Sequence, residues 1–226
     1  MNSTNNTYYF LFLITGWLIS VTASGQKTAG AIDLVSVAKQ NGFTTFNRSL
    51  TVIQEGSRPG VRLEQKEADA GFAWLSGSSF SEGTIEFDAR GKDEFQRSFL
   101  GIAFHAKDEK LYDAVYFRPF NFRAEDPVRH RHAVQYISIP GFDWPTLRKD
   151  FPDQYEQFIE PAPDPTGWFH VRLVVEKETI RVFVNDHSTP SLAVKKLNDR
   201  IDGKIGLWVG AGSGGDFANL KITPVR

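Results

Sequence analysis

Apolar and polar residues alternate with a period of two along much of this chain. In the segment GTIEFDARG, Ile85 and Phe87 alternate with Glu86 and Asp88, which is the pattern of a strand with one buried face. Similar short runs recur between clusters of Gly, Pro, Asn and Asp, which are turn residues. The pattern predicts an all-β fold, a two-sheet antiparallel jelly-roll sandwich.

Residues 83–138 read as four consecutive sheet strands whose polar faces point the same way. In FLGIAFHA, strict alternation places Gly101, Ala103 and His105 on one face. Small residues on an open face leave room for a ligand. We therefore expect the functional face of the molecule on these strands.

Polar side chains from these neighbouring strands fit a sugar. Tyr116 offers a ring for stacking, Arg118 offers paired donors, and Gln135 offers an amide for hydroxyl groups. His105 adds a group that titrates near neutral pH. The alternative is a hydrated sheet face with one salt bridge between Arg118 and Asp113.

Residues 119–131 interrupt the strands with a loop rich in Arg and His. Its Arg123 and the basic residues that follow fit an anionic group, such as an acidic sugar. The alternative is a solvated loop neutralised by its own acidic residues. His130 and His132 have the spacing of two metal ligands on a strand, but no third ligand nearby completes a site.

Residues 141–165 form a second excursion. Asp143 can cap a helix that we expect over residues 143–158, with an apolar stripe on one side. Trp144 begins that stripe. It is either a stacking platform at the rim of a cleft or an anchor that packs the excursion onto the sandwich.

Three side chains are candidates for acid–base chemistry. Glu86 and Asp88 lie two residues apart, hence on one face of a strand, and paired carboxylates serve glycosidases. His105 is the third candidate. Alternation alone also accounts for both carboxylates as the exposed face of an outer strand.

Composition excludes several classes of function. The chain has 226 residues and a formal net charge of −1, so it has no global basic field for nucleic acid. It contains no Cys, which excludes disulfides, thiolate metal sites and a Cys nucleophile. It also lacks a phosphate loop, a GxSxG elbow and a dinucleotide fingerprint.

Residues 1–25 are predicted to be a signal peptide. The apolar run Tyr8–Val21 precedes small residues, with cleavage expected near Ala23, although no Lys or Arg stands before the run. A retained membrane anchor is the alternative, but the run is shorter than the ~20 residues of a spanning helix. We expect a leader at 26–42, a β-sandwich at 43–226, and a secreted or periplasmic protein free of the membrane after cleavage.

The segments GTIEFDARG, GIAFH, DAVYFRPFNF, WFHVRLVV, VFVN and GKIGLWVG resemble the concanavalin A-like (laminin-G-like) jelly roll. They are most similar to its exported bacterial branch, which includes the 3-keto-disaccharide hydrolase domain. The resemblance covers roughly residues 43–222. It implies two antiparallel sheets, one of them concave, with sugars as the usual ligand, and it specifies fold better than activity.

The resemblance leaves the chemistry open. Laminarinase-like members use Glu-x-Asp followed by a second Glu, where this chain has Arg90 and Gly91. Analogy allows a structural calcium ion, yet Asp186, Asp202 and Asp216 lie in turns without the ligand density of a calcium loop. No metal site or other cofactor is predicted.

Three functions fit the sequence. The first is an exported carbohydrate-binding or carbohydrate-active module, with the ligand on the concave face under residues 119–131 and 141–165. The second is a glycoside or 3-keto-sugar hydrolase, and the third is a non-catalytic interaction domain of the envelope. For the first, Arg118→Ala is expected to weaken glycan binding and to leave the melting temperature nearly unchanged.

Overall fold

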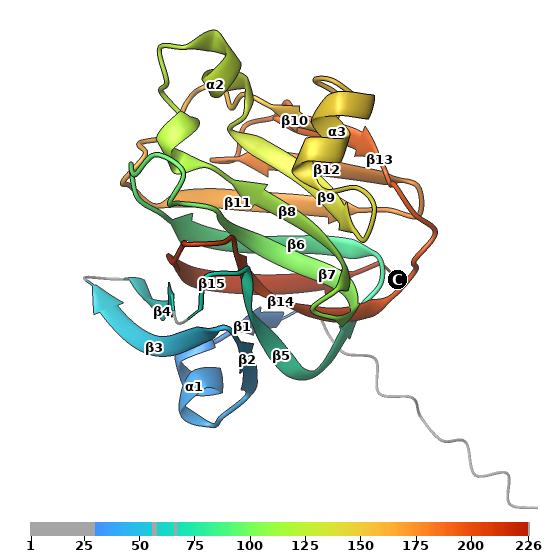
Figure 1. The fold of residues 1–226 in the computed structure, drawn as a ribbon. Coiled ribbons are helices and arrows are strands. Elements are labelled where there is room, and N and C mark those ends of the chain that lie inside the picture. Colours follow the sequence, from blue (N-terminus) through green and yellow to red (C-terminus); the bar gives the residue numbers. More distant parts are fainter. Residues whose placement is uncertain (1–29, 56–57, 66, 226) are drawn as a thin grey trace, which may run out of the picture.

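The computed structural model describes residues 30–55, 58–65 and 67–225. The chain forms two antiparallel β-sheets packed face to face (Figure 1). This confirms the jelly-roll sandwich that the alternation predicts. The predicted signal peptide lies outside the described residues. In the part of the chain that is described, no helix has the length and apolar character needed to cross a membrane.

The first sheet has eight strands. Strand β1 (Gly30–Ile32) pairs with β15 off the main path. The other strands, in spatial order, are β13 (Leu192–Lys195), β12 (Thr179–Val184), β11 (Phe169–Val175), β6 (Gly83–Arg90), β15 (Gly215–Pro224), β4 (Arg58–Gln65) and β3 (Arg48–Glu55).

The second sheet has seven strands and carries the site described below. Its central strands β7, β8 and β9 are consecutive in sequence and pair as antiparallel neighbours. In spatial order the strands are β10 (Glu156–Gln157), β9 (Val134–Ile139), β8 (Leu111–Phe117), β7 (Leu100–Asp108), β14 (Gly203–Val209), β5 (Gly71–Phe80) and β2 (Phe43–Phe46).

Short helices fill the connections. The Asp143 carboxylate accepts a hydrogen bond of 3.0 Å from Thr146 N and caps α3, as the sequence predicts. The helix is shorter than the expected 143–158, because the chain after it extends to form β10 and pairs with β9. The helices are α1 (Leu34–Lys39), the 3₁₀ turn η1 (Pro119–Asn121), α2 (Pro127–Arg131) and α3 (Trp144–Asp150).

The main core lies between the sheets. Ile85 and Phe87 of β6 are fully buried there, as are Leu100 and Ile102 of β7. These are the apolar positions of the period-two pattern. Because alternate residues of a strand point to opposite faces, their polar neighbours lie on the outer faces of the sandwich.

A second apolar layer covers the outer face of the seven-stranded sheet. It includes Tyr112, Tyr116 and Trp208 from the strands and Leu147 from α3. The expectation of an open polar face is therefore wrong for this surface. Aromatic rings cover much of it, and the excursion of residues 141–165 packs against it.

The expectation that residues 83–138 form four neighbouring strands is wrong for the first of them. Strand β6 lies in the eight-stranded sheet, between β11 and β15, whereas β7, β8 and β9 lie in the other sheet. Alternation defines which face of a strand is buried, but it does not say which of two sheets the strand joins. Glu86 and Asp88 therefore lie on the opposite outer face of the sandwich from β7–β9.

Candidate functional site

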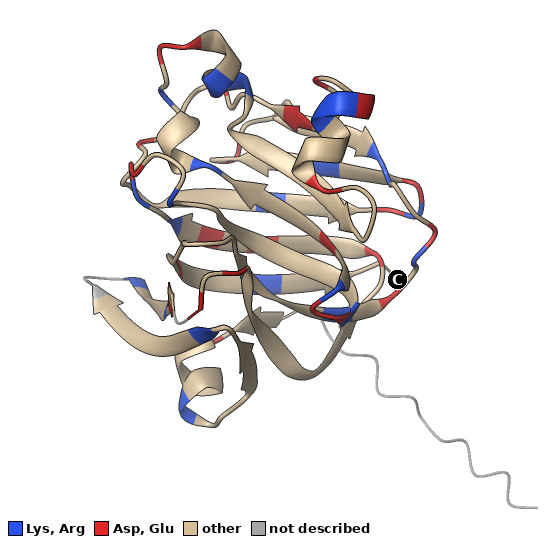
Figure 2. Cartoon of the chain, viewed as in Figure 1, with Lys and Arg blue, Asp and Glu red and all other residues tan. Residues whose placement is uncertain are grey.

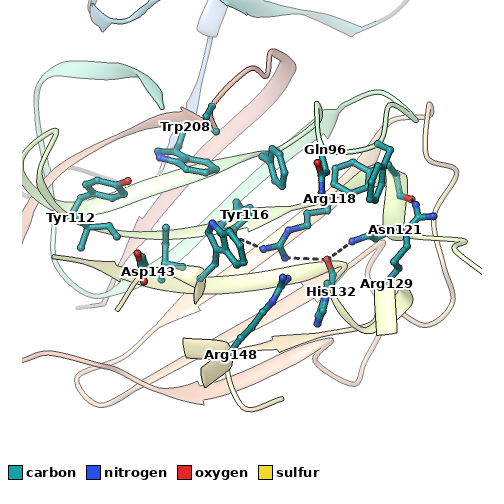
Figure 3. A pocket seen from close by; sticks show the side chains of 18 residues that line it. Gln96, Tyr112, Tyr116, Arg118, Asn121, Arg129, His132, Asp143, Arg148 and Trp208 are labelled. Atoms are coloured by element: carbon teal, nitrogen blue, oxygen red, sulfur yellow. Dashed lines mark hydrogen bonds between the residues drawn. The ribbon is translucent and has the colours of Figure 1, made fainter. Parts of the chain in front are cut away.

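A pocket with a volume of about 630 Å³ opens on the outer face of the seven-stranded sheet (Figure 3). Strand residues form its floor, and the excursions of residues 119–131 and 141–165 supply two of its walls. Residues 95–99, between β6 and β7, supply a third. The lining residues are Phe95, Gln96, Phe99, Tyr112, Tyr116, Arg118, Phe120, Asn121, Arg129, His132, Ile137, Ile139, Asp143, Trp144, Arg148, Trp208, Gly210 and Ala211.

The pocket floor depends on Gly101. This glycine pairs with Tyr116 of β8 on one side and with Trp208 of β14 on the other. A Cβ atom on Gly101 would lie 2.1 Å from the Val115 carbonyl oxygen and 2.6 Å from the Tyr116 Cα. Its small size therefore serves a close approach of strands. With no side chain between them, the Tyr116 and Trp208 rings come together with centroids 4.8 Å apart.

Arg118 lies at the centre of the pocket and is almost fully buried (Figure 3). Its Nη2 donates to the Tyr116 hydroxyl at 2.6 Å and also to Gln135 Oε1. Its Nη1 donates to the His132 carbonyl at 3.1 Å. The guanidinium also lies over the Tyr116 ring, 4.7 Å from its centroid. The expected grouping of Tyr116, Arg118 and Gln135 is therefore present in the structure.

Gln135 lies beside Tyr116 on the neighbouring strand β9 and holds this group in place. It is fully buried and is not among the residues that line the pocket. Its Oε1 accepts from the Tyr116 hydroxyl at 2.7 Å as well as from Arg118. Gln135 therefore fixes the positions of two pocket side chains and does not itself line the pocket.

Glu156 on β10 balances the positive charge beneath the pocket. Arg148 of α3 donates to its two carboxylate oxygens at 2.7 and 2.8 Å. Arg118 Nη1 lies 3.5 Å from Glu156 Oε2, and His132 Nε2 lies 3.2 Å from Oε1. Burial lowers the pKa of His132, which favours its neutral form.

The remaining predicted contact residues occupy different positions. Trp144 lines the pocket and is half exposed, with Arg148 over its ring at 4.9 Å. Arg123 is exposed and does not line the pocket. Trp144 therefore lies at the rim of the pocket, while Leu147 packs its helix on the sheet.

His105 does not join the pocket. The pairing of β7 with β8 shifts register between Phe104 and Asp108, and His105 has a φ of 49°. The irregularity turns the side chain away from the face of Ala103. Its Nδ1 contacts Asp113 Oδ2 at 3.2 Å, and its Nε2 contacts the Ser81 carbonyl at 2.6 Å. Strict alternation fails at this residue, which is buried.

Glu86 and Asp88 form ion pairs and hydrogen bonds on the outer face of the eight-stranded sheet. Lys221 lies 2.9 Å from Glu86. Asp88 contacts His170 Nδ1 at 2.8 Å and accepts from Asn219 at 2.7 Å. These contacts agree with a structural role for the two carboxylates. The expected exposed face of an outer strand is wrong, because β6 lies between β11 and β15 and Asp88 is buried.

The Asp88–His170 pair makes stability depend on pH. The hydrogen bond that His170 donates to the Asp88 carboxylate raises the pKa of His170, so protonation of His170 stabilises the fold. This stability is complete below the ordinary pKa of about 6.5 and is lost as pH rises through the raised value. Asp88→Asn should lower the His170 pKa in an NMR titration and reduce stability by about 1 kcal/mol at pH 6. An unchanged His170 pKa would contradict this assignment.

Several pocket residues escaped the sequence analysis. Phe95 and Phe120 wall the pocket from connections that have no strand pattern, and Trp208 reads as a core residue. Phe99 begins the run FLGIAFHA on the face of Gly101, but the sequence does not single it out. Arg148 reads as helix surface, whereas Arg129 belongs to the basic residues after Arg123 that the sequence assigns to an anionic group. One usable signal was the pair of phenylalanines within the otherwise polar segment KDEFQRSF. Exposed aromatic residues in a polar loop are typical of binding surfaces.

The described residues contain no group of three or more His, Asp or Glu side chains that could hold a metal ion. This applies to the turns that hold Asp186, Asp202 and Asp216 as well.

No protein-family model and no curated protein matches the sequence. Solved structures do match. A carbohydrate-binding module, CBM66, from Bacillus subtilis is 18% identical, with a TM-score of 0.58 over 80% of this chain and 96% of that one. A protein of unknown function with a galectin-like fold, also from Bacillus subtilis, is 13% identical, with a TM-score of 0.59 over 87% and 96%.

The exoplasmic/lumenal domain of VIP36, in a form bound to Ca²⁺ and Man3GlcNAc, is 10% identical, with a TM-score of 0.51 over 83% of this chain and 85% of that one. At such identities the likeness concerns fold and not activity. The strand topology and these neighbours together show that the chain has the concanavalin A-like jelly-roll fold.

Proposed function

We propose that this chain is an exported carbohydrate-binding module that takes a glycan into the pocket on the outer face of its seven-stranded sheet. The observation that carries the proposal is the floor of the pocket. There the Tyr116 and Trp208 rings lie beside the fixed guanidinium of Arg118. A sugar has apolar C–H faces that stack on rings, and this floor offers the rings. Its hydroxyls need hydrogen bonds, which polar residues in the pocket walls, such as Gln96, can offer.

The fold neighbours support the same class of ligand. CBM66 is named as a carbohydrate-binding module, and the VIP36 domain is described with a bound mannose-containing glycan. Export rests on the predicted signal peptide at residues 1–25. The proposed nearness to the 3-keto-disaccharide hydrolase branch rests on the sequence segments alone.

Binding is favoured over hydrolysis because the sequence-predicted catalytic residues do not meet in the pocket. Glu86 and Asp88 lie on the opposite outer face, and His105 contacts Asp113 away from the pocket lining. The lining contains one carboxylate, Asp143, which caps α3. A pair of free carboxylates across the pocket, as glycosidases use, is not found among the described lining residues.

A glycan panel tests the proposal. The purified chain is titrated with neutral and acidic oligosaccharides by calorimetry, and each mixture is then analysed for products. Binding without turnover is expected. Product formation would show that the chain is a hydrolase. If neither binding nor product were detected, the proposal would be wrong and a non-catalytic interaction domain would be the remaining function.

Trp144→Ala is expected to weaken glycan binding by about 3- to 10-fold, the range of an aromatic contact. The side chain is 50% exposed at the pocket rim, so the melting temperature should hardly change. Phe158→Ala is the matched control, since Phe158 is 45% exposed on the same excursion and does not line the pocket. Equal effects of both variants on affinity would remove Trp144 from the site.

A further inference from the structure

Three arginines line the pocket, and their hydrogen-bond donors are engaged to different degrees. Arg118 directs both terminal nitrogens at protein acceptors, which are Tyr116, Gln135, the His132 carbonyl and Glu156. Its role is therefore to hold the floor together. Few of its donors remain for a ligand.

Arg129 of α2 is held differently. Its Nη2 donates to the Phe120 carbonyl at 3.0 Å, and its Nε lies 3.4 Å from Asn121 Oδ1. The guanidinium lies over the Phe95 ring at 4.5 Å. Among the described residues no carboxylate pairs with it. A guanidinium has five N–H donors, so most of those on Arg129 have no protein acceptor.

The charges around the pocket do not cancel. Arg118, Arg129 and Arg148 face two carboxylates, Asp143 in the lining and Glu156 beneath it. Burial lowers the pKa of His132, so its neutral form is favoured. One positive charge is therefore in excess, and it is concentrated at the end formed by α2. Figure 2 shows basic residues on both short helices that border the pocket, α2 and α3, with acidic residues at the helix ends and largely uncharged central strands beside them.

We infer that the glycan bound in this pocket is anionic and that Arg129 binds its charged substituent. This inference rests on the proposed carbohydrate-binding function and names its ligand class. Neutral acceptors and a ring face hold the Arg129 guanidinium in place, so it is preorganised for a planar or tetrahedral oxyanion. The sugar ring then lies over Tyr116 and Trp208. The substituent is either a uronate carboxylate or a sulfate ester, which share this chemistry.

Pairs of ligands that differ only in the charged substituent show how much that charge contributes to affinity. Oligogalacturonides are compared with their methyl esters, and sulfated galactan oligosaccharides with their desulfated forms. At least one charged member is expected to bind about 10-fold or more tightly than its neutral partner, as for a charge-assisted hydrogen bond. The pair that shows the difference identifies carboxylate or sulfate. The preference should shrink as salt concentration rises.

Substitutions of Arg129 and Arg123 test which residue causes the preference for the charged ligand. Arg129→Gln should abolish the preference for the charged ligand, with the larger loss of affinity on the charged member of each pair, and Arg129→Lys should keep part of the preference. Arg123→Gln is the matched control, because Arg123 is exposed on the same excursion and does not line the pocket. Circular dichroism confirms that each variant is folded.

The outcomes distinguish the proposed carbohydrate-binding function from the inference that the ligand is anionic and contacts Arg129. Equal binding of charged and neutral partners would overturn the anionic ligand and leave the carbohydrate-binding function standing. A charge preference that survives in Arg129→Gln would overturn the role of Arg129. Absence of binding by every glycan would overturn the proposed function and this inference with it.

Discussion

Asp113→Asn is expected to lower the free energy of unfolding by about 3 kcal/mol, or roughly 6–12 °C in melting temperature for a chain of this size. The Asp113 carboxylate is completely buried. Arg200 donates to Oδ1 at 2.8 Å, Asn198 at 2.7 Å and the Tyr136 hydroxyl at 3.0 Å, while His105 contacts Oδ2. Asparagine keeps the shape but removes the charge that these donors surround, and it turns one acceptor into a donor.

Asp153→Asn is the control for this effect. Asp153 also pairs with an arginine, Arg131, but both side chains are about half exposed. Such a pair contributes at most about 1 kcal/mol. Denaturant unfolding of both variants should therefore separate them clearly. If they lost the same stability, the buried network around Asp113 would contribute no more than an exposed ion pair.

The pH dependence of Asp113 has the opposite direction to that of His170. Burial would raise the pKa of Asp113, but His105 and Arg200 hold it below its ordinary value. A carboxylate with a lowered pKa contributes stability that is present above the unfolded pKa of about 3.9 and is lost as pH falls through the lowered value. The free energy of unfolding of the wild type should therefore fall as the solution is made acidic. That of Asp113→Asn should fall less, because the variant has already lost this contribution.

The sandwich and most strand positions follow from alternation alone. Burying one face of a strand requires apolar residues at every second position, and that pattern is visible at Ile85 and Phe87. Alternation carries no information on partners, however. The same pattern fits β6 in either sheet, and only the pairing with β11 and β15 settles its place. Glu86 and Asp88 were therefore expected on the wrong face.

Local irregularities account for the other differences. The register shift at His105 breaks the period of two. The positive φ of this residue cannot be predicted from the fact that it is a histidine. Gly101 was correctly singled out as small, but a close approach of strands explains it. Tyr116 lies on the outer face of the sheet as alternation predicts, because Val115 and Phe117 of β8 point into the core between the sheets. Arg118 follows β8 directly and lies on the side of Tyr116.

The walls of the pocket come from outside the strand pattern. Phe95 and Phe120 lie in connections, where no period exists to indicate which way a side chain points. Glu156 lies in a two-residue strand that forms only by pairing with β9. Such residues are set by tertiary contacts, so the sequence alone predicts the floor of the site better than its rim.

The structure changes the expectation that Arg118→Ala would leave the melting temperature unchanged, since Arg118 is only 4% exposed. Removal of either member of the Arg118–Glu156 pair should destabilise the fold, but unequally. Without Arg118, Glu156 keeps Arg148 and His132 as partners. Without Glu156, the Arg118 guanidinium is buried with no carboxylate. Glu156→Gln should therefore cost about 3 kcal/mol, and Arg118→Met less.

The double variant separates binding from stability at this pair. Arg118→Met combined with Glu156→Gln removes both buried charges, so it should be more stable than Glu156→Gln alone. Glycan affinity should nevertheless stay about 10-fold or more below wild type, because Arg118 fixes the Tyr116 hydroxyl and supplies charge to the pocket floor. Calorimetric titration and thermal unfolding of the four proteins measure both quantities. If affinity returned together with stability in the double variant, Arg118 would act on the glycan only through the fold.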